Sequence, residues 1–248
     1  NHEVNRRDDT LRLGPKLNFG FSGVSRNVIS AKQHVIYSQV ARPATNIQLA
    51  QTLAFRKEND LDRDDVLHGI ESAPCRSYWP YAFAEAAPDG SPVEYCRLSR
   101  LSVPRILAAF EEDEVVHFFA LWCEHTLRQL GASVRAGKPT DGSYHVYDCS
   151  GVSWATLLSD ARSHRATLAR VFAVGGEHWP DISSRYFIIN APYGATLLWK
   201  LLAPLIGQHV HEKISIARGT PRELVAALGG EPAVRRMQAC SPHVAAPP

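Results

Sequence analysis

The chain has 248 residues, 45% of them hydrophobic and 21% charged, with a formal net charge of +2 at pH 7. Such a chain can bury the core of one α/β domain with an appendage or of two small domains, and so small a charge gives no argument for a nucleic-acid partner. The five cysteines are scattered and lack a C-x-x-C spacing, which argues against paired disulfides and a zinc site and favours a reducing compartment.

The amino-terminal segment is polar and basic without an apolar core, so we expect no signal peptide. The longest apolar run lies within residues 195–206, contains Lys200 and Pro204, and is shorter than the roughly 20 residues of a membrane-spanning helix. Because the chain begins at Asn1 rather than methionine, we expect a fragment or a processed product.

Residues 1–72 are expected to form an amino-terminal region in front of the main domain. Residues 1–40 mix charge, glycine and asparagine without periodicity, which predicts irregular or partly disordered chain. A helix is predicted from Asn46 to about Leu67, because Asn46 can cap it and the apolar residues that follow form one stripe.

Residues 73–230 alternate between strand and helix patterns, which predicts an α/β domain with a mostly parallel sheet. The predicted strands are Trp79–Phe83, Val93–Leu98, Ser143–Cys149, Arg185–Asn190 and Lys213–Ala217, the first two forming a hairpin. The predicted helices are Val103–Phe110, Glu114–Leu130, Val152–Val174, Ala195–Ile206 and Pro221–Leu228. We expect Gly175-Gly176 to end the third helix and residues 231–248 to form a loose tail.

The helix Ala195–Ile206 is apolar around most of its circumference, with Lys200 as its one strong charge. Such a helix is either buried in a core or faces an apolar ligand. The leucines that create this surface are Leu197, Leu198, Leu201, Leu202 and Leu205.

The segment Trp179–Gly219 contains several motifs in an ungapped order. They are Trp-Pro-Asp, Tyr-Phe-Ile-Ile-Asn-Ala-Pro-Tyr-Gly, an apolar helix ending in Ala-Pro-Leu-Ile, and His-Glu-Lys-Ile-Ser-Ile. This order resembles the CRAL-TRIO lipid-binding domains, in particular the branch of yeast-type phosphatidylinositol/phosphatidylcholine transfer proteins. The resemblance extends over about Ala41–Leu228 and implies the CRAL-TRIO α/β fold, with an apolar gate helix and a small helical region in front.

The resemblance also implies a headgroup site for a phospholipid. Lys213 matches the family lysine that meets the phosphate of phosphatidylinositol, and Asp181 matches its acidic partner. Arg42 matches a basic contact from the amino-terminal region. Without the resemblance, Lys213 and Asp181 would be interpreted as a surface ion pair.

The family pocket is matched at Phe83, Ser143, His145 and Tyr147, the last three on one face of a strand. Phe83 and Glu94 replace two pocket tyrosines and His145 replaces a threonine, which argues against phosphatidylcholine. Ser143 and His145 either serve another lipid or are satisfied core residues. Glu94 in an apolar cavity would be costly unless it is paired.

In the family, the helix that matches Ala195–Ile206 is a gate that opens at the membrane. Gly194 and Gly207 flank this helix, so we expect them to act as hinges.

The sequence gives weaker support for three other kinds of site. A hydrolase could use Ser150 or Ser153 with His145 and Asp148, but no G-x-S-x-G elbow is present, and His145 and Asp148 lie on opposite faces of a strand. No G-x-G-x-x-G follows a strand, which excludes a Rossmann cofactor site. His209-x-His211 and residues 122–125 lack further metal ligands at suitable spacing.

We therefore expect a non-enzymatic monomer that binds one phospholipid, phosphatidylinositol, and exchanges it between membranes, with no cofactor, metal or nucleic acid. We expect it in the cytoplasm, peripheral to Golgi or endosomal membranes by resemblance. One alternative is a lipid sensor or scaffold that presents a bound lipid to a partner protein. Another is the tocopherol/retinaldehyde branch of the family, in which His209 would stand where a basic residue near the gate is expected.

Overall fold

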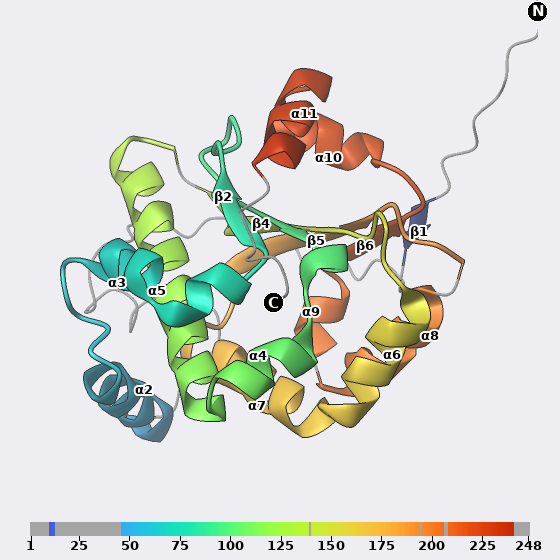
Figure 1. Cartoon of the computed structure of the whole chain (residues 1–248). Coiled ribbons are helices and arrows are strands. Elements are labelled where there is room, and N and C mark those ends of the chain that lie inside the picture. The colour runs from blue at the N-terminus through green and yellow to red at the C-terminus, as the bar shows by residue number, and fades with distance from the viewer. Residues whose placement is uncertain (1–9, 13–45, 139, 194, 206–207, 241–248) are drawn as a thin grey trace, which may run out of the picture.

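A mixed sheet with strand order β1-β6-β5-β4-β3-β2 forms the centre of the computed structural model, which describes residues 10–12, 46–138, 140–193, 195–205 and 208–240 (Figure 1). The pairs β3–β4, β4–β5 and β5–β6 are parallel, whereas β2–β3 and β1–β6 are antiparallel. The predicted α/β class, mostly parallel sheet and hairpin are confirmed. The strands are β1 Thr10–Arg12, β2 Tyr81–Ala84, β3 Val93–Arg97, β4 Ser143–Asp148, β5 Ser183–Ile189 and β6 Ile214–Ala217.

Helices cover both faces of this sheet (Figure 1). The α-helices are α2 Asn46–Glu58, α3 Val66–Ser72, α4 Val103–Ala109, α5 Glu112–Arg135, α6 Trp154–Ser163, α7 Arg165–His178, α8 Ala195–Leu202, α9 Gln208–His211, α10 Arg222–Leu228 and α11 Glu231–Ala239. Three short 3-10 helices are η1 Pro74–Tyr78, η2 Leu98–Arg100 and η3 Ala203–Leu205.

Alternation along the strands divides the sheet into two different faces. One face is an apolar layer under α10 and α11, where Tyr95, Val146 and Phe187 pack against Leu224 and Met237. The other face bears the intervening residues and is covered by α4 to α8. Titratable side chains of this second face line a cavity, so it contains the candidate site.

The single helix predicted from Asn46 to about Leu67 is wrong, because the chain turns after α2. Asp60 has a left-handed φ of 49°, and the backbone N–H of Leu61 donates to Arg56 O at 3.0 Å. Leu61 is fully buried. Burial of this leucine therefore outweighs continuation of the helix, and α3 starts afresh at Val66.

The predicted helix Val152–Val174 is two helices, separated at His164, and its predicted end at Gly175-Gly176 is wrong. Helix α7 continues through both glycines to His178. A Cβ at Gly175 would lie 3.3 Å from the ring of Phe119 on α5, so the glycine lets the two helices approach closely. At the end of α7, His178 stacks on Phe55 of α2 with ring centroids 4.0 Å apart, and this contact holds the last turn.

The loose tail predicted from residue 231 is wrong for Glu231–Ala239, which form α11. Val234 and Met237 are each 2% exposed on the sheet. Gly229 and Gly230 have φ values of 85° and 121°, which reverse the chain between α10 and α11. Residues 241–248 lie outside the described residues.

Residues Thr10–Arg12 form a short strand, although irregular chain was predicted for this part of the amino-terminal region. Strand β1 pairs with β6, with Leu11 opposite Ile216. That prediction is therefore wrong for Thr10–Arg12. The other residues of the 1–40 stretch lie outside the described residues.

Two glycines should respond to alanine in opposite directions. Gly142 has a φ of 140°, and a Cβ there would lie 2.7 Å from Ser184 N and 2.9 Å from Ile182 O. Gly142→Ala should therefore destabilise the fold by about 1–3 kcal/mol. Gly176 lies inside α7 with no atom within 4 Å of its added Cβ, so Gly176→Ala should stabilise by about 0.5–1 kcal/mol. Urea unfolding of the two variants checks both signs.

Candidate functional site

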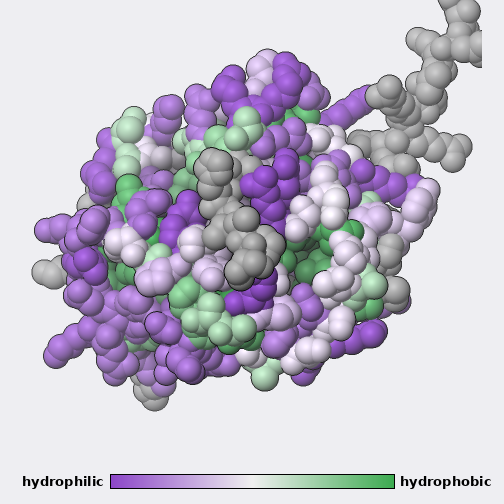
Figure 2. Space-filling model, in the orientation of Figure 1, coloured by the Kyte–Doolittle hydropathy of each residue, from purple (hydrophilic) through white to green (hydrophobic). Residues whose placement is uncertain are grey.

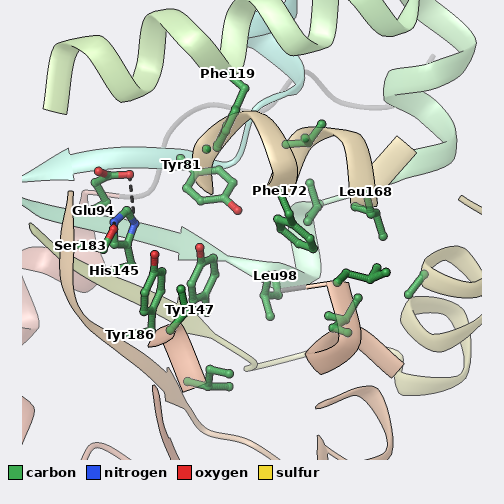
Figure 3. A pocket seen from close by; sticks show the side chains of 18 of the residues that line it. Tyr81, Glu94, Leu98, Phe119, His145, Tyr147, Leu168, Phe172, Ser183 and Tyr186 are labelled. Atoms are coloured by element: carbon green, nitrogen blue, oxygen red, sulfur yellow. Dashed lines mark hydrogen bonds and ion pairs between the residues drawn. The ribbon is translucent and has the colours of Figure 1, made fainter. Parts of the chain in front are cut away.

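A cavity of about 580 Å³ lies between the second face of the sheet and the helices that cover it (Figure 3). Its volume is within the range of small-molecule sites in proteins. Most of its lining is apolar or aromatic and comes from α4 to α8, η2, η3 and the strands. In the surface view, apolar residues gather in a recess bordered by hydrophilic residues (Figure 2). The arrangement suits a ligand with a large apolar part.

Helix α8 and η3 form one wall of this cavity. Leu198, Leu202 and Leu205 line it, whereas Leu201 is half-buried outside the lining. The side chain of Leu197 and the two predicted hinges, Gly194 and Gly207, lie outside the described residues. Movement of α8 as a gate stays a prediction.

Glu94 and His145 stand side by side in the middle of the cavity's sheet wall. They are register partners on β3 and β4, and Tyr186 is the partner of His145 on β5. His145 Nδ1 lies 3.3 Å from Glu94 Oε2, and the Tyr186 ring stacks on the imidazole with centroids 4.9 Å apart. The register thus places a carboxylate, an imidazole and a phenol in one row.

Two donors from α5 complete the environment of Glu94, which is 3% exposed. Trp122 Nε1 donates to Oε2 at 2.6 Å and Thr126 Oγ1 to Oε1 at 2.7 Å. Burial alone would raise the pKa of Glu94, but the attraction of a protonated His145 and the hydrogen bonds from His145, Trp122 and Thr126 outweigh it and lower the pKa. The sequence indicated that Glu94 would need a partner in an apolar cavity, and its carboxylate has three: His145, Trp122 and Thr126.

Two serines meet the other nitrogen of His145. Nε2 lies 2.6 Å from Ser183 Oγ and 2.9 Å from Ser143 Oγ. Ser183 lines the cavity, whereas Ser143 is fully buried behind it and donates to Ile182 O at 3.2 Å. The predicted pocket position of Ser143 is therefore corrected: it touches His145 but not the cavity.

Phenols surround the remaining side of this polar group. Tyr81, Tyr147 and Tyr186 line the cavity (Figure 3). Burial raises the pKa of Tyr147 and Tyr81, and it raises the pKa of Tyr186 to about 12. All three phenols remain protonated at neutral pH and can donate hydrogen bonds.

Phe83 does not line the cavity, so the prediction that it does is wrong. Its ring stacks on Trp122, with centroids 4.3 Å apart and planes 15° apart, and meets His125 edge-on. Two residues earlier on the same face of β2, Tyr81 reaches the cavity. Phe83 instead supports the indole that donates to Glu94.

Lys213 and Asp181 are in contact at the edge of the same cavity. Lys213 Nζ donates to Asp181 Oδ1 at 2.8 Å and to Ser183 O at 2.9 Å. Each side chain is about one quarter exposed. The two residues are thus in contact, as the resemblance implied, and their role in binding a headgroup stays a prediction. Arg42 lies outside the described residues.

The cavity has a polar end and an apolar end. Ser183, Lys213 and Glu94 lie at or next to the amino ends of their strands, whereas Ile188 and Ile216 lie towards the carboxyl ends. Leu98, Leu101, Trp154 and Leu157, which follow the carboxyl ends of β3 and β4 in the chain, also line the cavity. An amphipathic ligand would therefore point its polar part towards the amino ends of β4 to β6.

The hydrolase combination considered from the sequence does not assemble. Asp148 accepts from Tyr95 at 2.6 Å and from Asn190 at 2.9 Å, and Tyr95 belongs to the layer under α10 and α11. His145 faces the cavity on the opposite side. Within the described residues there is no group of three or more histidine, cysteine, aspartate or glutamate side chains that could hold a metal ion.

No helix of the described part of the chain is long and apolar enough to cross a bilayer.

Sequence reasoning missed Ser183, Tyr186, Trp122 and Thr126 as parts of this site. Ser183 lay outside the predicted strand, which began at Arg185, and β4 and β5 have a register shift beside Ser143. Ser183 and Tyr186 are three residues apart, so regular alternation would put them on opposite faces of the sheet. The shift places both on the cavity face. The signal available in the sequence was Gly142, whose backbone freedom is needed beside the shifted segment.

Comparison with known proteins gives a family and a fold. The family model described as CRAL/TRIO domain matches residues 78–225. A phosphatidylinositol/phosphatidylcholine transfer protein of Arabidopsis thaliana, SFH9, is 23% identical over 171 residues, which cover 67% of this chain and 29% of that protein. The SEC14 cytosolic factor of Kluyveromyces lactis is 22% identical over 176 residues, covering 70% of this chain and 57% of that protein.

Among solved structures, that of Sfh5 matches with a TM-score of 0.58 and 14% identity, covering 84% of this chain and 73% of that one. At this identity the likeness concerns the fold alone. The chain spans between 25% and 39% of the length of the first four curated relatives it matches.

Glu94 should make folding stability depend on pH in the acid range. Its folded-state pKa is below the ordinary 4.5, so its contribution is complete above about pH 4.5 and is lost as the pH falls through the folded-state value. Glu94→Gln should therefore cost about 1–3 kcal/mol near neutral pH, and the difference from wild type should shrink towards about pH 3. Urea unfolding across this range checks it. The exposed Glu58→Gln is the control, and a difference for Glu94→Gln that did not vary with pH would contradict the assignment.

Proposed function

The chain belongs to the CRAL/TRIO domain family, and we propose that it binds one phospholipid, phosphatidylinositol, and exchanges it between membranes. The observation that carries this proposal is the position of the Lys213–Asp181 pair at the polar end of an otherwise apolar cavity. We propose further that it acts as a monomer on cytoplasmic membrane surfaces, Golgi or endosomal ones.

The apolar lining can compensate a lipid for the apolar contacts that it loses on leaving a bilayer. Each methylene removed from a bilayer loses about 0.8 kcal/mol of apolar burial that the carrier must replace. Leu157, Leu168 and Phe172 from α6 and α7, with Leu202 and Leu205 opposite, offer apolar contacts in place of neighbouring lipid chains.

The polar end supplies a cation for a phosphate. A lysine ammonium has three hydrogen-bond donors, and Lys213 directs donors to Asp181 Oδ1 and Ser183 O. These bonds orient the ammonium and leave a third donor for one phosphate oxygen. Asp181 holds the lysine in place, and its own left-handed φ of 61° brings the carboxylate back towards the lysine.

Helix α8 is the element that we propose to move. It presents Leu198 and Leu202 to the cavity and exposes Lys200 on its outer side, so displacement would open the apolar interior to a membrane. Exchange of this kind makes and breaks no covalent bond. Native mass spectrometry of the protein purified from cells tests the proposal directly, since the mass of a co-purified lipid identifies the ligand.

Lys213→Ala should reduce phosphatidylinositol transfer between vesicles by about tenfold or more, because a charge-assisted hydrogen bond contributes about 1.5–3 kcal/mol. Circular dichroism should show an intact fold. Lys57→Ala, which changes an exposed lysine on α2, is the matched control. Unchanged transfer by Lys213→Ala would refute the headgroup assignment, whereas lipid binding by the wild type without accelerated transfer would favour the sensor.

A charge on the cavity side of α8 should prevent loading of any lipid. Leu202→Glu places an unpaired carboxylate against the apolar lining, so extraction of fluorescent lipid from vesicles should fall about tenfold or more, whatever the headgroup. Lys200→Glu changes the exposed side of the same helix and should retain extraction. Equal behaviour of the two variants would contradict the assignment of α8 as the cavity wall that admits lipid.

A further inference from the structure

The proposed exchange leaves one arrangement in the cavity unexplained: a serine, a histidine and a glutamate in consecutive contact. Ser183 Oγ lies 2.6 Å from His145 Nε2, and His145 Nδ1 lies 3.3 Å from Glu94 Oε2. The three residues come from neighbouring strands β5, β4 and β3. We propose that they form a nucleophilic triad that cleaves a carboxylic ester of a ligand held in the cavity.

The contacts of Glu94 fix the roles of the three residues. Its pKa is lowered, so the carboxylate is ionised at neutral pH and can accept a hydrogen bond from the Nδ1–H group of His145. The tautomer with the proton on Nδ1 leaves the Nε2 lone pair towards Ser183, as a general base requires. Trp122 and Thr126 hold Glu94 from the other side, which makes it a positioning residue.

Ser183 is the nucleophile rather than Ser143, although both touch Nε2. Ser183 lines the cavity, and its backbone carbonyl is held by Lys213. Ser143 is fully buried and donates a hydrogen bond to Ile182 O. Its oxygen can accept from Nε2–H once His145 is protonated on both nitrogens, and it then stabilises the imidazolium.

A local irregularity of the sheet brings Ser183 to this position. The register shift between β4 and β5 moves Ser183 onto the cavity face together with Tyr186. Bulges of this kind occur next to active sites, where they re-aim a side chain. The stacked Tyr186 ring in turn fixes the plane of the imidazole.

The reaction balances with water as the only co-reactant. Ser183 Oγ attacks the ester carbonyl carbon while His145 Nε2 takes the hydroxyl proton, and the phenols of Tyr147 and Tyr186 donate to the carbonyl oxygen as it becomes negative. The C–O bond to the alcohol then breaks and His145 returns the proton to that alcohol. Water, deprotonated by His145, cleaves the acyl–Ser183 ester, and the released proton restores the serine hydroxyl.

The apolar end of the cavity defines the class of substrate. An acyl chain that extends towards Leu98 and Leu157, beyond the carboxyl ends of β3 and β4, would bring its carbonyl carbon near the polar end, where Ser183 lies. The substrate class is therefore an ester of a long- or medium-chain fatty acid. The inference rests on the proposed function only in using the same cavity, because a small ester can enter without lipid exchange.

Covalent labelling of the purified chain with a fluorophosphonate tests this proposal. We expect one adduct, located on Ser183 by peptide mass spectrometry, and release of p-nitrophenol from p-nitrophenyl octanoate. Ser183→Ala should abolish both, and Glu94→Gln should slow labelling by about a thousandfold or more. Ser215→Ala is the matched control, since Ser215 is a buried strand serine outside the cavity lining whose hydroxyl has no hydrogen-bond partner within the described residues.

Three results would overturn the triad: no adduct on the folded wild type, an adduct on Ser143 or another serine, or unchanged labelling of Ser183→Ala. The three residues would then be a hydrogen-bonding site for the polar end of a ligand. Phosphatidylinositol transfer measured on the same preparations separates the two proposals. Failure of transfer with Ser183 still labelled removes the proposed function alone, whereas transfer without labelling removes the triad alone.

Discussion

An ionised carboxylate inside an apolar cavity must be compensated, and the surroundings of Glu94 are arranged around this requirement. Its partners come from β4 through His145 and from α5 through Trp122 and Thr126. Meeting the requirement therefore fixes how α5 packs across the sheet and which way the His145 ring points. The remaining polar contacts, to Ser183 and Tyr186, depend on that ring.

The parts of the fold that follow from local pattern were predictable from the sequence. The strand patterns identified five strands to within about two residues at each end, and the first two were correctly predicted to form a hairpin. Lys213 and Asp181 were paired correctly by resemblance, although 32 positions separate them. A family pattern carries such long-range information, whereas composition and periodicity do not.

The errors arose where tertiary contacts override local preference. Gly175 in α7 is tolerated because it accommodates the Phe119 ring, and α11 forms because Val234 and Met237 are buried on the sheet. Ser183 was missed because the predicted strand began at Arg185, whereas β5 begins at Ser183, where a register shift places its side chain on the cavity face. None of these contacts is visible within a short window of sequence.

Ser183 belongs to both polar groups of the cavity: its carbonyl accepts from Lys213, and its hydroxyl meets His145. A ligand that draws Lys213 away from this carbonyl acts on the same residue that contacts the imidazole. Where binding at one group shifts Ser183, it changes the free energy of binding at the other, and linkage requires the two effects to be equal. The cavity therefore has two polar groups that share one residue: Lys213 at its edge and His145 on its sheet wall both contact Ser183.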